Sequence, residues 1–554
     1  MEFWRNTDWN YVTIIWETMM ICSIVFTSEI KKRGLPWDMW ERKYREELEH
    51  RRQAAIAGGG EKRIENQHRK GKLTARERLD YLFDDGSFVE LNMLIESQDV
   101  RFGMDRKKIP GDGVVIGYGR INGRVVYASA QDFTVIGGTL GEYHSKKICH
   151  IMDMALQMKV PYVSINDSGG ARIEEGISSL DGYSGIFYRN TRASGVIPQI
   201  SVILGPCAGG ACYSPAITDF IFMSKKSANM FITGPTVVKA VIGEDISTDE
   251  LGGAPVHASK SGVVHFTYDD DRGCLDGVKK LLSYLPENCD EKPPVTADRT
   301  GDESYRLEEI VPDNQRKPYD MKDVIHTLVD ADSFFEVQAE FARNIVVGFA
   351  RINGETIGIV GNNPQGGMAG SLDIDSSEKA ARFVRFCDCF NIPILTLVDV
   401  PGFFPGSKQE HGGIIRRGAK LLYAYAEATV PKVTLILRKA YGGAYIAMNS
   451  KGMGADIVYA WPIAETAVLG AEGAVGIMYG KQIDASEDPE AERARLVAEY
   501  DKRFMTPYIA AEKGYIDEVI LPEETRIRIQ GAFEALRLKD RNAAGFRAHG
   551  NIPL

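Results

Sequence analysis

Apolar runs of strand length alternate with amphipathic stretches of helical length along most of this chain. Asn122-Gly123 stands between two apolar runs, and this dipeptide commonly forms the two-residue turn of a β-hairpin. Over 141–158 the apolar residues recur with the period of a helix. In chain order, the predicted elements are strands at 113–120 and 125–128, a helix at 141–158, a strand at 160–165, a helix at 181–193 and a strand at 200–204. Strands that alternate with helices in this way predict an α/β fold.

The same order of elements returns in the second half of the chain. Arg120-Ile121-Asn122-Gly123 recurs as Arg351-Ile352-Asn353-Gly354, and the apolar run after Pro198 recurs after Pro431 at almost the same separation. The repeated elements are a hairpin at 346–360, a helix at 376–390 and strands at 394–398 and 433–437. A repeat of this length is the size of a domain, so the chain is predicted to contain two tandem copies of one α/β domain.

Segments of different composition flank the two copies and define the predicted domain boundaries. Residues 1–38 include an apolar stretch at 12–26 that is interrupted by Glu17 and would be only about 22 Å long as a helix, too short to cross a bilayer. Because a charged helical stretch begins at Met39, we expect residues 1–38 to be a non-native or upstream extension. The predicted domains are an N-terminal domain at 39–290 that opens with a helical arm at 39–85, a Pro-rich, charged linker at 291–320, and a C-terminal domain at 321–554.

Composition narrows the classes of function. A net charge of −10 argues against nucleic acid as a partner. Eight scattered cysteines do not form a disulfide framework, so a reducing compartment, the cytoplasm, is expected. Neither of the close cysteine pairs, Cys207/Cys212 and Cys387/Cys389, has the partner spacing of a zinc site, so no metal is expected in this chain.

Two copies of Gly-Gly-Ala are the strongest candidates for chemistry. Gly209-Gly210-Ala211 and Gly442-Gly443-Ala444 are separated by the length of the repeat, and each stands after a predicted strand and at the start of a predicted helix. The first N–H groups of a helix lack internal acceptors, and glycine lets a ligand approach them closely. Such donors can stabilise a developing negative oxygen, as in an oxyanion hole. The alternative interpretation is that the glycines only allow close helix–strand packing. Recurrence of the motif in both copies makes this alternative weaker.

A second loop precedes each Gly-Gly-Ala motif, at the same spacing in both copies. Asp167-Ser168-Gly169-Gly170-Ala171 in the first copy corresponds to Asp399-Val400-Pro401-Gly402-Phe403 in the second. The equal spacing predicts that one loop amide pairs with one helix amide in each half. Asp167 and Asp399 are interpreted as residues that orient their loops, with a role as general bases as the alternative.

A basic cluster in the helical arm has two interpretations. Arg69, Lys70 and Lys72 are either a phosphate-contacting patch or part of a solvated helix surface.

Several common catalytic motifs are absent from the chain. It has no G-x-x-x-x-G-K-[ST] phosphate loop, no G-x-S-x-G nucleophile elbow and no H-E-x-x-H. The chemistry is therefore predicted to depend on backbone amides and a reactive ligand rather than on a side-chain triad.

Longer stretches of the chain resemble a known family. GPCAGGACYSPAITDF, RKAYGGAYIAMNSKGMGAD and DVPGFFPGSKQEHGGIIRRGAKLLYAYAEATVPK are similar to the carboxyltransferase (beta) subunits of biotin-dependent acyl-CoA carboxylases. The propionyl-CoA carboxylase type and the methylmalonyl-CoA transcarboxylase and decarboxylase subunits are nearest. The resemblance extends from about residue 40 to the end. It implies two tandem crotonase-like domains, which agrees with the duplication.

The resemblance also implies roles for the residues of both motifs. Those that would hold the oxygen of an acyl-CoA thioester enolate are Gly209, Gly210 and Ala211 with Gly169, Gly170 and Ala171. Those that would hold the ureido oxygen of biotin are Gly442, Gly443 and Ala444 with Gly402, Phe403 and Tyr441. Arg69, Lys70 and Lys72 would suit the CoA phosphates. Ile446 would form an apolar wall that favours a short acyl group such as propionyl.

The implied reaction moves a carboxyl group between N-carboxybiotin and the α-carbon of a short acyl-CoA. The conversion of propionyl-CoA to methylmalonyl-CoA is expected first, with acetyl-CoA as a second candidate substrate. The chain lacks a Met-Lys-Met biotinylation signature, so the biotin carrier and the biotin carboxylase would be other chains. A homohexamer is implied, with each site between the N-terminal domain of one subunit and the C-terminal domain of another, and with no direct membrane span.

Other functions remain as alternatives. The chain could be the alpha subunit of a methylmalonyl-CoA decarboxylase, or a transcarboxylase subunit, running the transfer in reverse. A crotonase-type enoyl-CoA hydratase or isomerase would instead use glutamates near the oxyanion hole, for which Glu174 and Glu175 are candidates. A non-catalytic scaffold is disfavoured because both Gly-Gly-Ala motifs are retained.

Overall fold

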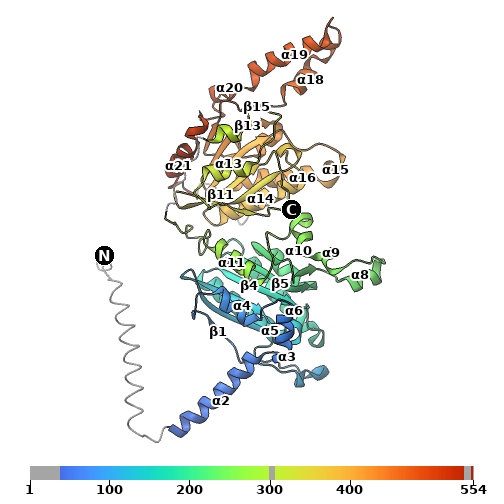
Figure 1. The fold of residues 1–554 in the computed structure, drawn as a ribbon, viewed down its shortest axis with the longest axis vertical. Helices are drawn as coiled ribbons and strands as arrows, with labels where there is room; N and C mark the ends of the chain where they lie inside the picture. The colour runs from blue at the N-terminus through green and yellow to red at the C-terminus, as the bar shows by residue number, and fades with distance from the viewer. Residues whose placement is uncertain (1–37, 298–305, 542–550, 553–554) are drawn as a thin grey trace, which may run out of the picture. The chain divides into compact units, whose positions relative to one another are not determined.

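The computed structural model describes residues 38–297, 306–541 and 551–552 (Figure 1). It consists of two units, residues 1–57 and residues 58–554, of which the first contributes the charged helix α2 (Asp38–Ala57). The interpretation of residues 1–38 as an extension concerns residues that, apart from Asp38, lie outside the described part of the chain.

The first sheet, in the second unit, is built from the N-terminal half. Its first three strands are antiparallel, and every later strand runs parallel to its neighbour. Asn122 and Gly123, at the turn of the predicted hairpin, both have positive φ, 52° and 78°, as a type I′ turn requires. In spatial order the strands are β1 (Val89–Leu91), β2 (Val114–Ile121), β3 (Arg124–Gln131), β4 (Tyr162–Ser168), β5 (Gln199–Ala208), β6 (Phe220–Ser224) and β8 (Phe266–Tyr268), with β7 (Asn229–Phe231) beside β5.

The second sheet repeats this topology from the C-terminal half. Asn353 and Gly354 again occupy the hairpin turn with positive φ, 53° and 76°. In the order that matches the first sheet, the strands are β9 (Phe335–Val337), β10 (Ile345–Ile352), β11 (Glu355–Asn362), β12 (Ile394–Val400), β13 (Lys432–Tyr441), β14 (Ile457–Ala460) and β16 (Glu518–Val519), with β15 (Glu465–Ala467) beside β13. The predicted α/β duplication is therefore confirmed, strand by strand.

Helices follow the strands at the predicted places. Helix α5 (Glu142–Met158) packs against α6 (Ile177–Ala193), and α14 (Ile374–Cys389) packs against α16 (Ile414–Glu427). The helical arm continues after α2 as α3 (Glu61–Arg69) and α4 (Ala75–Leu82). The other helices are α7 (Tyr213–Ile217), α8 (Pro235–Ile242), α9 (Thr248–Gly252), α10 (Ala254–Val256), α11 (Asp271–Leu282), α12 (Leu307–Ile310), α13 (Met321–Leu328), α15 (Ser407–Gly412), α17 (Gly442–Ala447), α18 (Ala471–Asp484), α19 (Pro489–Tyr500), α20 (Pro507–Glu512) and α21 (Thr525–Ala535).

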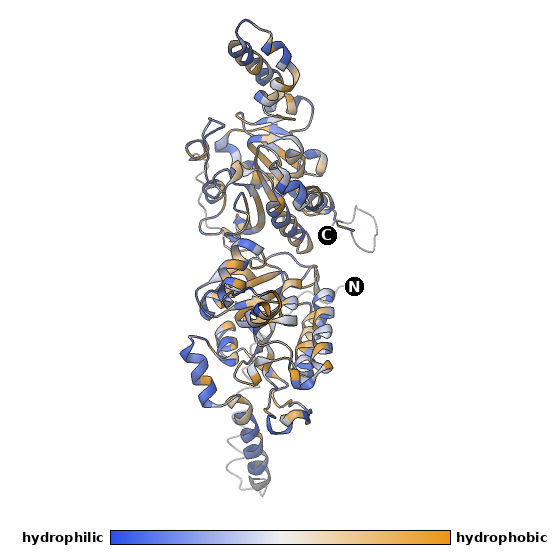
Figure 2. Cartoon of the chain, turned by 90° about the vertical axis from the view of Figure 1, so that its right-hand side faces the viewer, coloured by the Kyte–Doolittle hydropathy of each residue, from blue (hydrophilic) through white to orange (hydrophobic). Residues whose placement is uncertain are grey.

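One hydrophobic core continues from the first half into the second. The ring centroid of Phe220 in β6 lies 4.6 Å from that of Phe386 in α14, and Phe266 in β8 stacks on Phe335 in β9 at 4.7 Å. Figure 2 shows the hydrophobic colour concentrated on the strands of both sheets. Aromatic pairs of this kind add about 0.5–1.5 kcal/mol each beyond the area they bury, so the cluster holds the two halves together.

Part of the predicted linker belongs to the C-terminal domain. Leu307, Val311 and Tyr319 are buried and join the core on one face of the second sheet. These three apolar residues lie several residues apart within a strongly charged stretch, so the composition of the stretch predicted a linker rather than part of a core. Residues 298–305 lie outside the described part of the chain.

None of the helices in the described residues has both the length and the apolar character needed to cross a membrane.

Candidate active site

The carboxyl ends of β4 and β5 bring together the two motifs of the N-terminal half. Ser168 at the end of β4 is paired in register with Cys207 of β5. Gly170 has a φ of 103°, and a Cβ there would lie only 3.0 Å from the carbonyl oxygen of Ala208. Gly209 also has positive φ, 63°. Glycine is needed at both positions because the backbone is left-handed there, and the loop can then lie directly against the start of the Gly-Gly-Ala turn.

The backbone hydrogen bonds of this loop show which of its N–H groups are already used and which are available as donors. The N–H of Gly169 donates to the carbonyl of Gly137 at 3.0 Å, and that of Gly170 donates to the hydroxyl oxygen of Ser168 at 3.1 Å. Within the described residues, the N–H of Ala171 has no backbone or side-chain acceptor. In this loop, Ala171 is therefore the residue whose amide can reach a ligand.

The Gly-Gly-Ala turn supplies the other donors. Gly209–Cys212 forms a single 3₁₀ turn that leads into the short helix α7, and no side chain caps its start. The first N–H groups of the turn are consequently without internal acceptors. The expected helix is thus very short, so its contribution comes from these local N–H groups rather than from a long helix dipole.

The C-terminal half builds the same arrangement from β12 and β13. The isolated bridge between Leu372 and Phe403 repeats the bridge between Leu140 and Ala171, with both partners displaced equally along the chain. Phe403 therefore occupies the position of Ala171. Its ring lies 3.8 Å from the place where a Cβ on Gly443 would stand.

Tyr441 precedes the second Gly-Gly-Ala motif and is tied to β15. Its hydroxyl donates to the carboxylate of Glu465, and burial together with that carboxylate raises the pKa of the phenol. Gly442 follows with a φ of 59°, matching Gly209. Helix α17 then begins without a side-chain cap, so its first N–H groups are also available.

Asp167 is a buried anchor for the first loop. Its side chain is fully buried and accepts hydrogen bonds from Lys72 at 2.7 Å, Arg78 at 2.9 Å and Gln67 at 2.9 Å. Arg78 also donates to Asp271 at 2.8 Å. A carboxylate held by two cations in the interior is a structural group, which agrees with the interpretation that Asp167 orients its loop.

The same contacts correct the expectation for Lys72. Its side chain is buried, its ammonium pairs with Asp167, and burial lowers its pKa. Lys72 therefore does not form one surface patch with Arg69 and Lys70, which are exposed. The sequence pattern grouped the three because they are close in the chain, whereas the turn after α3 directs Lys72 inward.

Asp399 is held by residues of the neighbouring strand β13 rather than by the helical arm. It accepts from Arg438 Nε at 2.8 Å and from the N–H of Lys439 at 3.2 Å. Arg438 occupies the position in β13 that Gly205 occupies in β5, and a Cβ on Gly205 would lie 1.9 Å from the Asp167 carboxylate. Glycine in the first copy thus makes room for the cations of the helical arm, and arginine in the second copy supplies the cation from the strand itself. Sequence reasoning missed Arg78 and Arg438, although the Gly205/Arg438 mismatch between the copies was a visible signal.

A basic cavity adjoins the first loop. It has a volume of about 280 Å³ and is lined by Arg63, Lys70, Phe133 and Gly137, among others. Arg63 donates to the carbonyl of Thr134 at 3.0 Å. Gly137 lines this cavity and also accepts a hydrogen bond from Gly169 of the loop through its carbonyl, so the cavity and the loop share this residue. Arg63 was not predicted, and Arg69 does not line this cavity.

The remaining predicted residues fall in two places. Ile446 lies in α17 and is 45% exposed in the single chain, at the position that Tyr213 occupies in the first half.

Glu175 is buried and paired with Arg172, whereas Glu174 pairs with Lys107 near the surface. An ion-paired Glu175 is poorly suited to act as the acid–base group of a hydratase. Among the described residues, no three His, Cys, Asp or Glu side chains group as a metal site would require.

Comparisons with known proteins agree with this architecture. The carboxyl transferase domain family matches residues 66–552, so the chain belongs to that family. The carboxyltransferase subunit of propionyl-CoA carboxylase from Haloferax mediterranei is 55% identical over 92% of this chain and 99% of its own length. The alpha subunit of methylmalonyl-CoA decarboxylase from Propionigenium modestum is 54% identical over 92% of this chain and 98% of its own.

A solved structure shows the same fold. It is the transcarboxylase 12S hexamer with methylmalonyl-coenzyme A and methylmalonic acid bound, and it aligns with a TM-score of 0.89 and 52% identity over 92% of this chain and 98% of that one. The predicted fold class and family are confirmed. So is the enzyme class, a biotin-dependent acyl-CoA carboxyltransferase.

Proposed function

We propose that this chain transfers a carboxyl group between N-carboxybiotin on a separate carrier protein and the α-carbon of propionyl-CoA. The observation that carries the proposal is the pair of matched amide sites, one at the end of β4 and β5 and one at the end of β12 and β13. A transfer in which two oxygens become negative, one on each reactant, needs two such sites.

The N-terminal half is assigned to the thioester. The N–H of Ala171 and the first N–H groups of the Gly209–Cys212 turn would donate to the thioester oxygen. That oxygen gains negative charge as the α-proton leaves, and the donors are already oriented, so their stabilising effect needs no rearrangement. Asp167 fixes the loop from behind and takes no proton.

The C-terminal half is assigned to biotin. The space beside Gly402 is open, because a Cβ on Gly402 would meet no atom within 4 Å. The N–H groups of Phe403 and of the start of α17 can hold the ureido oxygen there. Carboxylated biotin, when bound, supplies the carboxyl group and then a nitrogen base, which fits the absence of a side-chain base in both motifs.

Two exposed apolar faces, one in each half of the chain, are candidates for contacts between subunits. Beside β7 and in α8 they are Ile232, Val241 and Ile242, and at the corresponding places beside β15 and in α18 they are Val468, Ile477 and Met478. None of the α8 residues is buried within this chain. Because the transcarboxylase 12S structure is a hexamer, we place these two faces at subunit contacts of a homohexamer, where the N-terminal site of one subunit meets the C-terminal site of another. Ile446 would then face the acyl group of the neighbouring subunit.

Charge at these faces should break the assembly. We expect Val241→Glu or Ile477→Glu to convert the hexamer to smaller species in light scattering after gel filtration, since a buried unpaired carboxylate is strongly unfavourable. Val295→Glu, at another exposed apolar residue, serves as the control and should leave the mass unchanged. A hexamer that persists in both face variants would contradict the assignment of these faces.

The cavity beside Gly137 is assigned to the CoA phosphates. Arg63→Gln and Lys70→Gln should each raise the KM for propionyl-CoA about tenfold with little change in kcat, because a hydrogen bond to a charged group contributes about 1.5–3 kcal/mol. Lys62→Gln, on the same helix but outside the cavity, is the matched control. With propionyl-pantetheine, which lacks these phosphates, the difference between variants should disappear; its persistence would place the phosphates elsewhere.

The direct test of function is decarboxylation of methylmalonyl-CoA to propionyl-CoA by the purified chain, with and without free biotin and with malonyl-CoA alongside. Biotin-dependent turnover that favours methylmalonyl-CoA supports the proposal. Hydration of an enoyl-CoA without biotin dependence would instead establish a crotonase-type hydratase. The direction in the cell, carboxylase or decarboxylase, follows from the partner chains that co-purify with it.

The proposed compartment is the cytoplasm. All seven cysteines in the described residues are free thiols, as a reducing compartment requires. Fractionation of the native cells with an antibody against the chain tests this assignment.

A further inference from the structure

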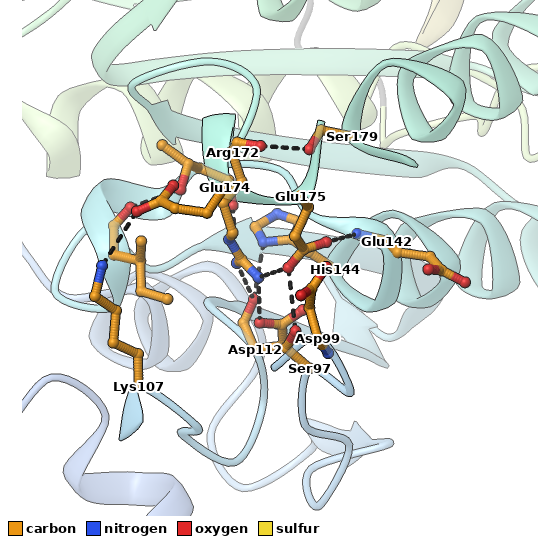
Figure 3. A network of polar contacts seen from close by, with 12 residues as sticks. Ser97, Asp99, Lys107, Asp112, Glu142, His144, Arg172, Glu174, Glu175 and Ser179 are labelled. Atoms are coloured by element: carbon orange, nitrogen blue, oxygen red, sulfur yellow. Dashed lines mark hydrogen bonds and ion pairs between the residues drawn. The ribbon is translucent and has the colours of Figure 1, made fainter. Parts of the chain in front are cut away.

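Arg172 directly follows the proposed oxyanion donor Ala171, and its guanidinium is enclosed by the protein. The side chain is fully buried and lies between two carboxylates (Figure 3). Its Nη1 donates to Asp112 at 2.8 Å and to Glu175 at 2.6 Å. Burying three charged groups together is costly, and the cost is not fully offset here, because Asp112 Oδ2 and Arg172 Nε have no hydrogen-bond partner among the described residues. A cluster held at such a cost is a specific feature of the loop rather than incidental packing.

The guanidinium also connects the loop to a neighbouring strap, residues 137–140. The strap and the loop are joined by three backbone hydrogen bonds: Gly169 N–H to Gly137 at 3.0 Å, Leu140 N–H to Gly170 at 2.9 Å, and Arg172 N–H to Leu140 at 2.9 Å. The Nη2 of Arg172 adds a fourth, to the carbonyl of Thr139 at 3.0 Å. The peptide that carries the Ala171 N–H is therefore held on both sides.

Glu175, one of the two carboxylates, is itself fixed from several elements. Glu175 accepts from the hydroxyl of Ser97 at 3.1 Å and from the N–H of Glu142 at 2.6 Å, at the start of α5. Gly141 leaves room for the pair, because a Cβ there would lie 2.5 Å from the guanidinium. Glu175 therefore cannot follow the arginine if it moves, so the Arg172–Glu175 pair acts as a rigid brace. Asp112 accepts from Arg172 through Oδ1, and its Oδ2 has no hydrogen-bond partner among the described residues.

Among the described residues, the N-terminal half has this brace and the C-terminal half does not. By the register of the two isolated bridges, Arg172 corresponds to Phe404, an uncharged residue that is 38% exposed. The hydrogen bonds of Leu372 to Gly402 and of Phe404 to Leu372 preserve the backbone pattern of the strap without any ion pair. The brace thus belongs to one site and is not a requirement of the duplicated fold.

We infer that Arg172 is a positioning residue for the thioester oxyanion site: through Asp112, Glu175 and the carbonyl of Thr139 it holds the Ala171 amide at the distance that the enolate oxygen needs. The inference rests on the proposed function. The thioester binds largely through its CoA portion, so a displaced amide should affect the chemical step much more than substrate binding. A misplacement of about 1 Å can reduce the rate of a step by about 100-fold.

The test measures carbonyl polarisation as well as turnover. Propionyl-CoA labelled with ¹³C at the thioester carbonyl is bound to the full-length protein, and the shift of its infrared carbonyl band relative to water is recorded. We expect Arg172→Lys, which keeps one charge but not the planar fork, to lose at least half of the wild-type shift. Its kcat for methylmalonyl-CoA decarboxylation should fall about 100-fold, with the KM for methylmalonyl-CoA and for free biotin within about threefold of wild type.

Two further variants make the result decisive. Glu175→Gln keeps the shape of the brace, and its band shift and kcat should both fall, but by less than in Arg172→Lys. This variant provides the test if Arg172→Lys does not fold. Lys107→Met removes the neighbouring surface pair with Glu174 and should change neither the band nor kcat. A wild-type band shift that is retained in both brace variants overturns the inference. The absence of any shift in the wild-type protein would instead count against the proposed thioester site.

Discussion

Replacing Gly443 by valine should reduce biotin-dependent decarboxylation of methylmalonyl-CoA by about 10²–10³-fold, the usual effect of losing one oxyanion donor. Gly443 has no left-handed φ, and a Cβ there would make an ordinary 3.8 Å contact with Phe403. The backbone can therefore accept a side chain. The two extra methyl groups of valine would, however, occupy the space in front of the α17 amides.

Gly210→Val should cause a loss of similar size from the other half of the protein. A Cβ on Gly210 would stand 3.3 Å from the ring of Tyr183, which needs only a small adjustment. The two variants should differ in binding: Gly443→Val should retain the wild-type carbonyl band shift of bound propionyl-CoA, and Gly210→Val should lose it. Steady-state kinetics together with the infrared measurement separate the two sites.

Gly531→Val is the matched control, because a Cβ on Gly531 in α21 meets no atom within 4 Å and the residue lies outside both sites. It should keep full activity. Full activity in Gly210→Val or Gly443→Val would rule out the corresponding Gly-Gly-Ala turn as a donor site.

Replacing Arg78 by methionine should destabilise the protein by about 3–5 kcal/mol, as expected when one partner of a buried ion pair is removed. Arg78 is fully buried and joins Asp167, Asp271 and the carbonyl of Leu204. Its loss would leave Asp271 without its guanidinium partner, and Asp167 with Lys72 as its remaining cation. A decrease of about 3–5 °C in the midpoint of thermal unfolding is expected, because the entropy of unfolding of a unit of this size corresponds to about 1 kcal/mol per degree.

Lys146→Met provides the control for this change. Lys146 pairs with Glu142 at the surface, where an ion pair contributes at most about 1 kcal/mol. Its unfolding midpoint should stay within about 1 °C of wild type. Equal midpoints for Arg78→Met and wild type would show that the Asp167 cluster is not a structural anchor.

The duplication could be predicted from the sequence in detail. The hairpin turns at Asn122-Gly123 and Asn353-Gly354, the amphipathic period of α5, and the glycines that need positive φ at 209 and 442 all express local preferences. Such preferences depend on a few neighbouring residues, so they are visible without a structure. Matching them at a nearly constant separation along the chain was enough to identify two copies of one fold.

The side chains that support the sites were much less predictable. Arg78 meets Asp167 and Asp271, and both carboxylates belong to segments far from it in the chain. Lys72 looked like part of a surface patch because its neighbours in sequence are exposed. Its inward direction depends on the turn after α3 and on the space that Gly205 leaves beside Asp167.

By itself, the sequence determined the α/β class, the duplication, the family and the two Gly-Gly-Ala motifs, because periodicity, turn chemistry and motif spacing are properties of the chain. Only the tertiary structure decided that Ala171, and not Gly169 or Gly170, has an available amide, and that Arg172 braces it. An N–H group is available or occupied according to which acceptors the fold brings within hydrogen-bonding distance, and those acceptors come from distant segments.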